Sequence, residues 1–531
     1  MKCKDFIGFF NFYPCKDKKK KEDICILIND SQNSSIIKKV STAQLKNLAH
    51  YTGIAGIITL SFFCYSSNFF PLLGSDDAIQ VLMIHDFKLP HDLYFWGQDR
   101  YGSLIPLLGQ LFYRGFGISP LTSESVTHFL ILIAGYFAFA GLFKSKSSRF
   151  ILAVLWFFPP IRMIDLLRLN IGLEYSLLAI GIFMINKLYG NDFEKYRLKQ
   201  HVFLLSVVIL FILSTWVSDL AAVSIILILA LQVYFGDFRK SIHQRFLTFW
   251  KPEVYYFLGG AIIGAAFIFY GKYYADKSPL YANFNNLKTV FASIRIFGGS
   301  LLELLLFKAS EPFTSAYLYL VILCAASLFI MRGHIRLTQE VKKWILFFVL
   351  DFILLFGVIM LSRWSYMNGV PRRYFICCYI SFWMTFLLAF DNMEASDIKK
   401  AMRVVLIIGV VMAGVGSLYN LKYIWPKTLK PKVEFVREFE SLGRIGIIGN
   451  YWNSYINSIT NPDQIISTPD DRSSIRNRAM ANKVMKRDTI YIIKDGWMES
   501  FPDSLNQFGI QLYKNGNEFR MGDCFICRYR K

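Results

Sequence analysis

Long apolar blocks alternate with short polar stretches along most of this chain. The first block, residues 50–70, reads HYTGIAGIITLSFFCYSSNFF and contains no Lys, Arg, Asp or Glu. An apolar stretch of about 20 residues can cross a bilayer as a helix. The pattern therefore predicts a polytopic α-helical membrane protein with about eleven transmembrane helices. The expected spans are 50–70, 125–143, 150–160, 172–186, 202–215, 217–235, 254–271, 315–331, 344–361, 374–390 and 402–421.

The basic residues between these blocks predict the orientation. Lys and Arg are enriched in cytoplasmic loops, and the segment 1–49 contains the run Lys18–Lys21. We therefore expect a cytoplasmic tail over 1–49, without a cleaved signal peptide, and an external first loop over 71–123. The stretch GSLIPLLGQLFYRGFG in that loop predicts an amphipathic helix on the membrane surface. Because the block 150–160 ends at two prolines, a broken or re-entrant helix is an alternative there.

After residue 421 the pattern changes. Residues 422–531 have no long apolar run, and the strand-like stretches RIGIIG, TIYIIK and CFICRYR alternate with helical patterns. This predicts a small extracytoplasmic α/β domain that follows a membrane domain over 50–421. Cys524 and Cys527 form a single CxxC motif. In a strand these positions point to opposite faces, so neither a shared disulfide nor a zinc knuckle is expected.

Composition agrees with this interpretation and excludes nucleic acid as a partner. Of the 531 residues, 54% are hydrophobic and only 18% are charged, whereas soluble domains have about 25% charged residues. The net charge is +21, but Lys and Arg are concentrated in short loops between apolar blocks, as membrane topology requires. A nucleic-acid-binding protein would instead combine basic and aromatic residues on one face of a soluble module.

Candidate functional residues are concentrated in the expected external loops. Asp76 and Asp77 follow the first span directly, and Arg372, Arg373 and Tyr374 lie between two late spans. Charges at the membrane boundary are costly, which makes such residues functional candidates. The other candidates, mostly from the stretch HDLYFWGQDRYGSL, are Trp96, Gln98, Asp99, Arg100, Tyr101, Glu174 and Asp219.

These residue types suit group transfer from a membrane-bound phosphate donor. A carboxylate of the acidic pair, Asp76–Asp77, can take a proton from an acceptor hydroxyl or can hold a divalent cation such as Mg²⁺ or Mn²⁺. Arginines can bind a phosphate bidentately and neutralise the charge that develops on it. Tyr and Trp at headgroup depth can stack on a sugar ring.

The chain resembles the GT-C superfamily of integral-membrane glycosyltransferases, specifically bacterial relatives of the polyprenyl-phosphate-sugar-dependent mannosyl and aminoarabinose transferases. The matching stretches are SDDA, YFWGQDRYGSL, PRRYF and YWNSY, in a layout that covers roughly residues 50–460. The resemblance implies a polyprenyl-phosphate sugar donor, inverting transfer and a first-loop aspartate as base, with Asp76 favoured over Asp77. It also implies a bacterial inner membrane location and a lipid, glycan or protein acceptor on the external face.

The same residues also fit structural roles and further classes of membrane protein. The acidic pair can be a solvated turn, the arginine pair Arg372–Arg373 can reach the membrane interface without binding substrate, and Asp99–Arg100 can be a local ion pair. A lipid-linked glycan transporter or flippase, or a surface-polysaccharide polymerase or ligase, would use similar groups. A transporter is expected to show internal repeats and charges near the midplane. Here the charges lie at span ends, which favours an enzyme.

Overall fold

The structure, a computed structural model, describes residues 23–25, 39–190, 197–235, 252–276, 283–394, 396–421 and 430–531. The chain divides into two compact units, Met1–Gly56 and Ile57–Lys531. In the first unit, strands β1 (Asp23–Cys25) and β2 (Lys39–Ser41) form an antiparallel pair. The run Lys18–Lys21 lies outside the described residues.

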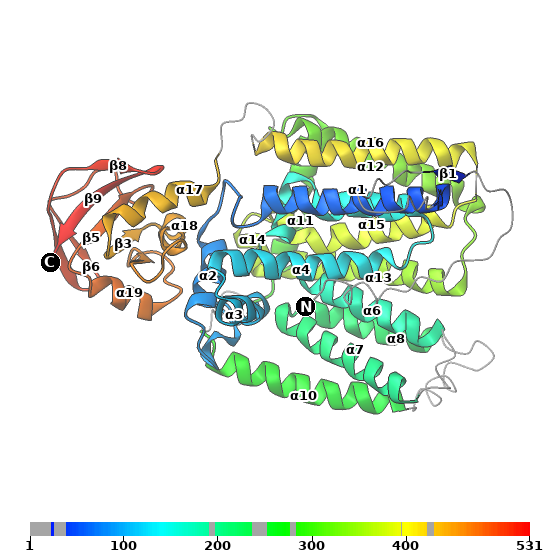
Figure 1. Cartoon of the computed structure of the whole chain (residues 1–531), viewed down its shortest axis with the longest axis horizontal. Coiled ribbons are helices and arrows are strands. Elements are labelled where there is room, and N and C mark those ends of the chain that lie inside the picture. Colours follow the sequence, from blue (N-terminus) through cyan, green and yellow to red (C-terminus); the bar gives the residue numbers. More distant parts are fainter. Residues whose placement is uncertain are drawn as a thin grey trace, which may run out of the picture. The chain divides into compact units, whose positions relative to one another are not determined.

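Eight helices of the described residues are long and apolar enough to cross a membrane. Each coincides with an expected span, which confirms the prediction of a multi-pass helical membrane protein (Figure 1). The eight are α1 (Thr42–Tyr65), α4 (Pro120–Ala140), α7 (Arg197–Val217), α10 (Pro252–Tyr274), α12 (Pro312–Ile330), α13 (Gln339–Leu361), α15 (Ile376–Asp391) with the preceding 3-10 helix η6 (Arg372–Phe375), and α16 (Asp397–Asn420).

The three other expected spans form shorter helices. α5 (Lys146–Phe157) and the 3-10 helix η3 (Ile161–Leu167) meet at an angle of 92°. Pro159 and Pro160 lie at this break, where proline removes a backbone donor and ends the helix. α6 (Glu174–Gly190) has 17 residues and α8 (Ala221–Tyr234) has 14, so both are shorter than a typical span of about 20 residues. Within the described residues, eight helices thus meet the length and hydropathy of a span, or nine with the bent pair, and the count of about eleven spans stays a prediction.

The first span begins earlier than its apolar block predicts. α1 starts at Thr42 rather than at His50, inside the segment 1–49 that the sequence indicates as a tail. The stretch TAQLKNLA that precedes the block is rich in good helix formers, namely Ala, Leu, Gln and Lys. The apolar pattern therefore marks the hydrophobic part of this helix and not its first residue.

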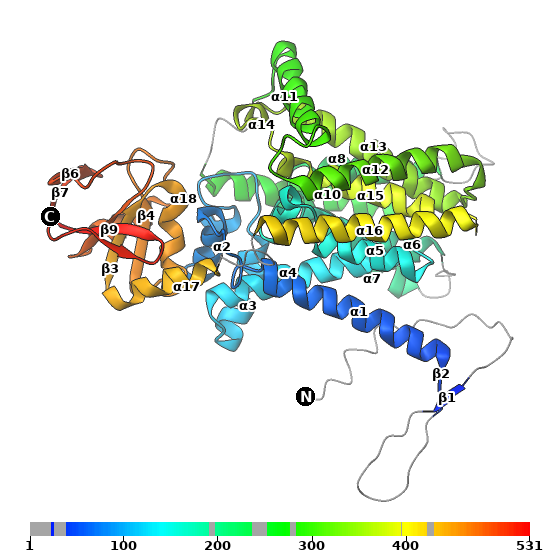
Figure 2. The same ribbon diagram turned by 90° about the horizontal axis from the view of Figure 1, so that it is seen from above.

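The segment 71–123 folds into two helices between α1 and α4. α2 (Ser75–His85) is followed by the 3-10 helix η2 (His91–Leu93) and then by α3 (Leu104–Phe116). On α3, Leu104, Ile105 and Gly109 are buried, whereas Leu111 and Phe116 are exposed. This confirms a helix at the expected place, and its position on the membrane surface stays a prediction. Figures 1 and 2 both show α2 between the C-terminal sheet and the ends of the long helices.

A buried polar cluster joins four helices of the membrane region. Asp351 of α13 is fully buried and accepts hydrogen bonds from Ser224 of α8 and Ser381 of α15, each at 2.6 Å. Tyr175 of α6 donates a third hydrogen bond to the same carboxyl group. A buried carboxyl group needs such partners, because a buried polar group without them is costly. The cluster fixes the beginning of α6, where Glu174 precedes Tyr175.

Residues 430–531 form an α/β fold around one mixed sheet of seven strands in the order β4-β3-β5-β9-β7-β6, with β8 paired to β9. β3 is parallel to β4 and β5, and β9 is antiparallel to β5 (Figure 1). The helices are α17 (Lys432–Arg437), α18 (Tyr451–Ser454) and α19 (Arg478–Met485). The strands are β3 (Ile445–Gly449), β4 (Ile465–Pro469), β5 (Ile490–Lys494), β6 (Ser504–Gln507), β7 (Ile510–Lys514), β8 (Phe519–Met521) and β9 (Cys524–Arg530).

This sheet confirms the predicted strands and the expectation that the two cysteines of the CxxC motif point to opposite faces. RIGIIG, TIYIIK and CFICRYR correspond to β3, β5 and β9, respectively. Cys524 packs in one hydrophobic cluster with Phe439 and Ile445, whereas Cys527 packs in another with Val484. The two cysteines therefore lie on opposite faces of β9, and both are free.

Candidate active site

The two residues of the acidic pair have different surroundings. Both lie in the first turn of α2, where successive side chains point about 100° apart. Asp77 is buried, accepts a hydrogen bond from the backbone N–H of Gly74 at 2.9 Å, and contacts Nη2 of Arg168 with both oxygens at 2.8 and 2.6 Å. Asp76 instead lines a cavity of about 470 Å³. The structure thus separates the two carboxylates that the sequence presents as a pair.

The cavity around Asp76, called here the Asp76 cavity, combines one carboxylate with several cations and aromatic rings. Asp76 is the single acidic residue among the described residues that line it. Its arginines are Arg100, Arg373, Arg472 and Arg476. Its aromatic residues are Phe95, Tyr101, Trp364, Tyr374, Tyr451 and Trp452. Its remaining polar residues are Gln80, Gln98, Asn170, Asn368, Ser473 and Ser474. The C-terminal α/β fold and the membrane region therefore build this cavity together.

Asp76 has a direct partner from the C-terminal fold. The hydroxyl of Tyr451 donates a hydrogen bond to Asp76, and Nε of Arg476 donates to the Tyr451 oxygen at 3.3 Å. Burial raises the pKa of Asp76 above its usual value, while the hydrogen bond from Tyr451 and the charge of Arg476 oppose the rise. Such a carboxyl group is a suitable proton acceptor, since efficient bases have a pKa closer to neutrality than that of an exposed Asp.

Two glycines of the GQDRYG stretch allow the close approach of other elements. Gly97 has φ +70°, and a Cβ there would lie 2.6 Å from Cδ of Arg476. Nη1 of Arg476 donates to the Gly97 carbonyl at 3.1 Å. A Cβ on Gly102 would lie 2.4 Å from the carbonyl oxygen of Trp216, which accepts the Gly102 N–H at 2.9 Å. The glycines fix this loop between α7 and the C-terminal fold, which places Arg100 and Tyr101 in the cavity wall.

A chain of ion pairs connects the acidic pair with the arginine pair. Arg168 contacts Asp77 and lies 3.6 Å from Asp165, whose carboxylate lies 3.6 Å from Nη1 of Arg373. The Arg168 guanidinium also lies over the ring of Phe70, 3.8 Å from its centroid. Asp165 belongs to η3 and Arg168 directly follows it. The short segment after the two prolines therefore contacts both candidate groups.

The two residues of the arginine pair, Arg372 and Arg373, also have different surroundings. Arg373 lines the Asp76 cavity. Nη2 of Arg372 donates to Glu311 at 2.9 Å, and Glu311 also accepts from Nε of Arg162 at 2.8 Å. Arg372 lines neither the Asp76 cavity nor a smaller cavity that adjoins it. Tyr374, the next residue after Arg373, lines both of these cavities.

The other predicted residues of the first loop also have different surroundings. Gln98 lines the Asp76 cavity, whereas Arg100 and Tyr101 line both cavities. Trp96 is buried and donates from Nε1 to Asp92 at 3.0 Å, so it supports the loop from inside. Asp99 lines neither cavity.

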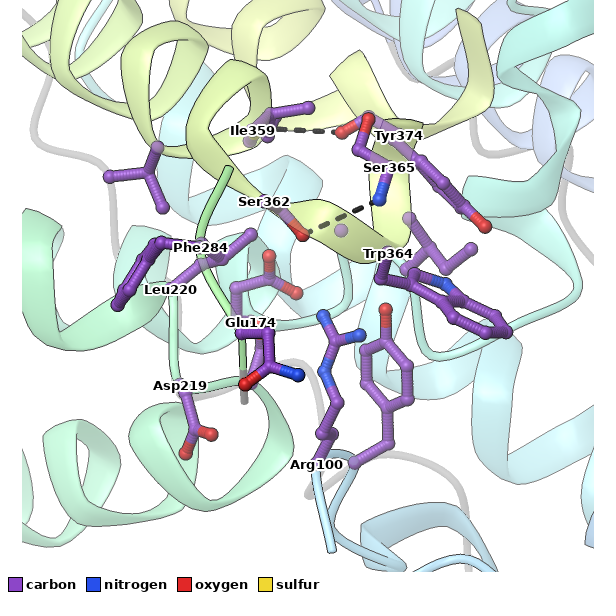
Figure 3. Close-up of a pocket in the computed structure, with 17 residues that line it drawn as sticks. Arg100, Glu174, Asp219, Leu220, Phe284, Ile359, Ser362, Trp364, Ser365 and Tyr374 are labelled. Atoms are coloured by element: carbon purple, nitrogen blue, oxygen red, sulfur yellow. Dashed lines mark hydrogen bonds between the residues drawn. The ribbon is translucent and has the colours of Figure 1, made fainter. Parts of the chain in front are cut away.

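A smaller cavity of about 260 Å³, the Glu174 cavity, adjoins the first (Figure 3). It contains both Glu174 and Asp219, and the two cavities share Arg100, Tyr101, Ile171, Trp364 and Tyr374. Asp219 is half exposed and accepts hydrogen bonds from Nζ of Lys272 at 2.8 and 3.0 Å. The predicted residues that line a cavity are therefore divided between two adjoining cavities.

The donor set does not fit a divalent cation on the acidic pair. Both oxygens of Asp77 contact Arg168, so Asp76 remains as the one carboxylate of the cavity. Within the described ranges, His, Cys, Asp and Glu form no group of three or more that could hold a metal ion. Arginines, rather than carboxylates, dominate the charge of the cavity wall.

Several residues of this arrangement are not among the candidates from the sequence. Arg168 and Asp165 are missing there, although charged residues directly after an apolar block that ends in two prolines are a usable signal. Tyr451 belongs to the stretch YWNSY, for which the sequence indicates no role of its own. Arg472 and Arg476 lie in a polar loop of the C-terminal fold, where nothing in the sequence distinguishes them from solvated residues.

Comparisons with known proteins give structural matches without sequence matches. No family model matches the chain, and no curated protein matches it. Oligosaccharyltransferase AglB from Archaeoglobus fulgidus, solved with an inhibitory peptide and a dolichol-phosphate, aligns with a TM-score of 0.44 and 12% identity over 85% of this chain and 70% of its own. ArnT from Cupriavidus metallidurans, bound to undecaprenyl phosphate, aligns with a TM-score of 0.45 and 9% identity over 92% of this chain and 98% of its own.

The arabinofuranosyltransferase AftD from Mycobacteria aligns with a TM-score of 0.37 and 13% identity over 76% of this chain, but over only 29% of its own length. All three TM-scores are below 0.5, so the functional proposal below rests on the residues of the site. The three neighbours are all glycosyltransferases of the GT-C superfamily.

Proposed function

We propose that this chain is a membrane glycosyltransferase that transfers a sugar from a polyprenyl-phosphate donor to a lipid, glycan or protein acceptor. The observation that carries this proposal is the Asp76 cavity, in which one partly buried carboxylate faces arginine and aromatic side chains. A transferase of this type needs a base for the acceptor, cations for the phosphate and flat surfaces for the sugar. The cavity has all three kinds of residue.

In the proposed reaction, Asp76 is the base. Its carboxylate takes the proton of the acceptor hydroxyl while the hydroxyl oxygen forms a bond to the anomeric carbon of the sugar. The bond between that carbon and the donor phosphate oxygen breaks, and its electron pair remains on the phosphate. Attack from the face opposite the phosphate inverts the anomeric configuration. The occupied oxygens of Asp77 support Asp76 as the base, since a base needs an accessible oxygen.

Arg373 is the proposed ligand of the donor phosphate, with Arg100 beside it in the wall of the same cavity. Charge that develops on a leaving phosphate is stabilised by cations already in place. The contact of Arg372 with Glu311 supports a structural role for Arg372. Trp364, Tyr374 and Tyr101, which line both cavities, offer rings on which the sugar can stack.

The remaining expectations on topology complete the proposal. The tail 1–49 is cytoplasmic, the membrane domain covers 50–421, and the C-terminal domain 422–531 lies on the external face of the bacterial inner membrane. Tyr451, Arg472 and Arg476 of the C-terminal fold line the Asp76 cavity, so this domain has a direct part in the site. In this arrangement, donor and acceptor both reach the site from the external side.

The decisive experiment is transfer by the Asp76→Asn variant in proteoliposomes supplied with undecaprenyl-phosphate sugars and a membrane extract as the source of acceptors. We expect kcat to fall by a factor of about 10² to 10⁴, the usual contribution of a general base. Binding of undecaprenyl phosphate should stay within about threefold, because the carboxylate acts on the acceptor. Asp397→Asn, which changes a fully exposed carboxylate of α16 (95% exposed side chain), is the matched control.

Full transfer activity in Asp76→Asn would contradict the role of Asp76. A wild-type chain that moves lipid-linked sugars across the bilayer without breaking the sugar–phosphate bond would instead establish the transporter alternative. Mass spectrometry of the lipid products separates the two outcomes, since only the transferase releases undecaprenyl phosphate.

A further inference from the structure

The Glu174 cavity contains one buried polar atom without a hydrogen-bond partner in largely apolar surroundings. Glu174 is 3% exposed, and its Oε2 has no hydrogen-bond partner among the described residues. The side chain lines the cavity together with Leu220, Phe284 and Ile359. In Figure 3 the carboxyl group of Glu174 and the guanidinium group of Arg100 both point into this space. Most buried polar atoms in proteins are hydrogen-bonded, so this oxygen indicates a missing partner.

The position of Glu174 is fixed by the surrounding helices. It is the first residue of α6, and its carbonyl accepts a hydrogen bond from Oγ of Ser214 at 3.1 Å. Its neighbour Tyr175 donates to the fully buried Asp351. The carboxyl group is therefore held at the cavity wall by a backbone that is anchored on both sides, and it does not need a ligand for its placement.

The chemistry of the cavity restricts what can occupy it. A hydrocarbon tail would leave the Glu174 oxygen unsatisfied, which is costly in a buried place. A phosphate would bring a second anion next to the carboxylate, and like charges at close range repel. A group that donates a hydrogen bond, a hydroxyl or an ammonium, meets neither obstacle. The aromatic rings of Tyr101, Trp364 and Tyr374 in the same wall suit the flat face of a sugar ring.

The size and connection of the cavity point to the same occupant. Its volume of about 260 Å³ lies below the about 300–1,000 Å³ of pockets that bury drug-sized ligands, so it suits a group of the size of a monosaccharide. It adjoins the Asp76 cavity through shared residues, among them Arg100. A sugar attached to a phosphate near Arg373 and Arg100 can therefore extend from one cavity into the other.

We propose that Glu174 accepts a hydrogen bond from a hydroxyl or ammonium group of the donor's sugar and thereby determines which sugars the protein accepts. This inference rests on the proposed function and deepens it. Asp219, the other carboxylate of the cavity, differs because Lys272 neutralises it and its side chain is 52% exposed. Glu174 acts on sugar selection, whereas Asp76 acts on the acceptor.

The test compares the binding of bare undecaprenyl phosphate with that of undecaprenyl phosphate carrying a hexose, a deoxyhexose or an amino sugar. For the wild-type chain in detergent, we expect at least one sugar to increase the affinity about tenfold over bare undecaprenyl phosphate, the range of a hydrogen bond to a charged group. Glu174→Gln should reduce that gain to about threefold or less and leave the affinity for bare undecaprenyl phosphate unchanged. The affinities follow from ligand-dependent shifts in Tm.

Glu340→Gln is the matched control, because it makes the same chemical change in the first turn of α13, where the side chain is exposed. A Glu174→Gln variant with normal Tm and an undiminished gain from sugar would overturn the role of Glu174 while the proposed function stands. No sugar-dependent gain in the wild-type chain would also overturn it. If neither bare nor sugar-linked undecaprenyl phosphate binds, the proposed function fails together with this inference.

Where transfer is measurable, kcat/KM gives an independent readout. We expect the wild-type chain to prefer the best sugar donor over its deoxy or deamino analogue by about 100-fold, since a site built to bind a polar group rejects an analogue that lacks it. In Glu174→Gln this preference should decline to a few-fold, mainly because kcat/KM for the preferred donor falls. An unchanged preference ratio would overturn the inference, because a purely structural role of Glu174 would affect both donors alike. Glu174→Asp, which keeps the carboxylate, should retain part of the preference.

Discussion

The acidic pair and the arginine pair lie about 300 residues apart in the chain, and the structure divides both in the same way. Of the acidic pair, Asp76 lines the cavity and Asp77 contacts Arg168 at 2.6 Å. Each carboxylate is thus either presented to the cavity or used for anchoring. The anchored member is the one whose charge is already neutralised.

The arginine pair repeats this division with the charges reversed. Arg373 lines the cavity, and Arg372 contacts Glu311 at 2.9 Å. Glu311 also contacts Arg162 of η3, the same 3-10 helix that contains Asp165. One short segment after the two prolines therefore anchors both pairs. In both pairs, therefore, one residue is held by a structural ion pair and its neighbour lines the Asp76 cavity.

The largest expected effect that tests this difference between neighbours is a loss in the free energy of unfolding. Asp77→Asn removes one partner of a buried ion pair, which usually costs about 3–5 kcal/mol. We expect the lower end, about 3 kcal/mol, because Arg168 keeps its contact with Asp165. Thermal unfolding in detergent measures the change, and the double variant Asp77→Asn/Arg168→Gln should recover part of the loss.

Asp76→Asn is the matched comparison for stability. Because the pKa of Asp76 is raised in the folded state, its ionised form opposes folding at any pH above the unfolded-state pKa of about 4. At neutral pH the variant should therefore unfold at the same temperature as the wild-type chain or at a higher one. If Asp77→Asn were as stable as Asp76→Asn, the two carboxylates would not differ as described.

The second effect concerns activity and distinguishes the two arginines. Arg373→Gln should lower kcat/KM about 10- to 100-fold, the range of a lost hydrogen bond between charged groups. Arg372→Gln should leave kcat/KM within about threefold but lower Tm, because the buried Glu311 loses one of its two arginine partners. Steady-state kinetics with an undecaprenyl-phosphate sugar provide the comparison. Equal losses of kcat/KM in both variants would show that the pair acts as one clamp.

The sequence shows the elements of this arrangement better than its contacts. Apolar blocks predict the spans because burial in lipid requires them, and short strand-like stretches predict β3, β5 and β9. The division of Asp76 and Asp77 follows from the start of α2 at Ser75, which the sequence alone does not indicate. The partner of Asp77 is Arg168, 91 residues further on. Nothing local marks such a distant partner, and the same holds for Tyr451, which contacts Asp76 across 375 positions.

The smallest expected effect is a change in the pH dependence of transfer. The ionised form of Asp76 is the proposed base, so kcat/KM should fall as the pH falls through its pKa. Burial raises that pKa, so the acidic limb of the profile of kcat/KM against pH should lie above the pKa of an exposed Asp, which is about 4. The hydroxyl of Tyr451 donates to the ionised carboxylate and opposes the rise. Tyr451→Phe should thus shift the limb to higher pH and leave the plateau within about threefold.

This shift distinguishes a direct contact from mere support of the fold. Tyr455→Phe is the matched control, since the Tyr455 hydroxyl accepts from the backbone N–H groups of Arg476 and Asn477 at 3.0 and 3.1 Å instead of donating to Asp76. It should lower Tm without moving the limb. If Tyr451→Phe lowered the plateau and left the limb in place, Tyr451 would support the cavity only through packing, and the base would lie elsewhere. A limb that moves only with Tyr451→Phe ties the proton transfer to Asp76, the member of the acidic pair that faces the cavity.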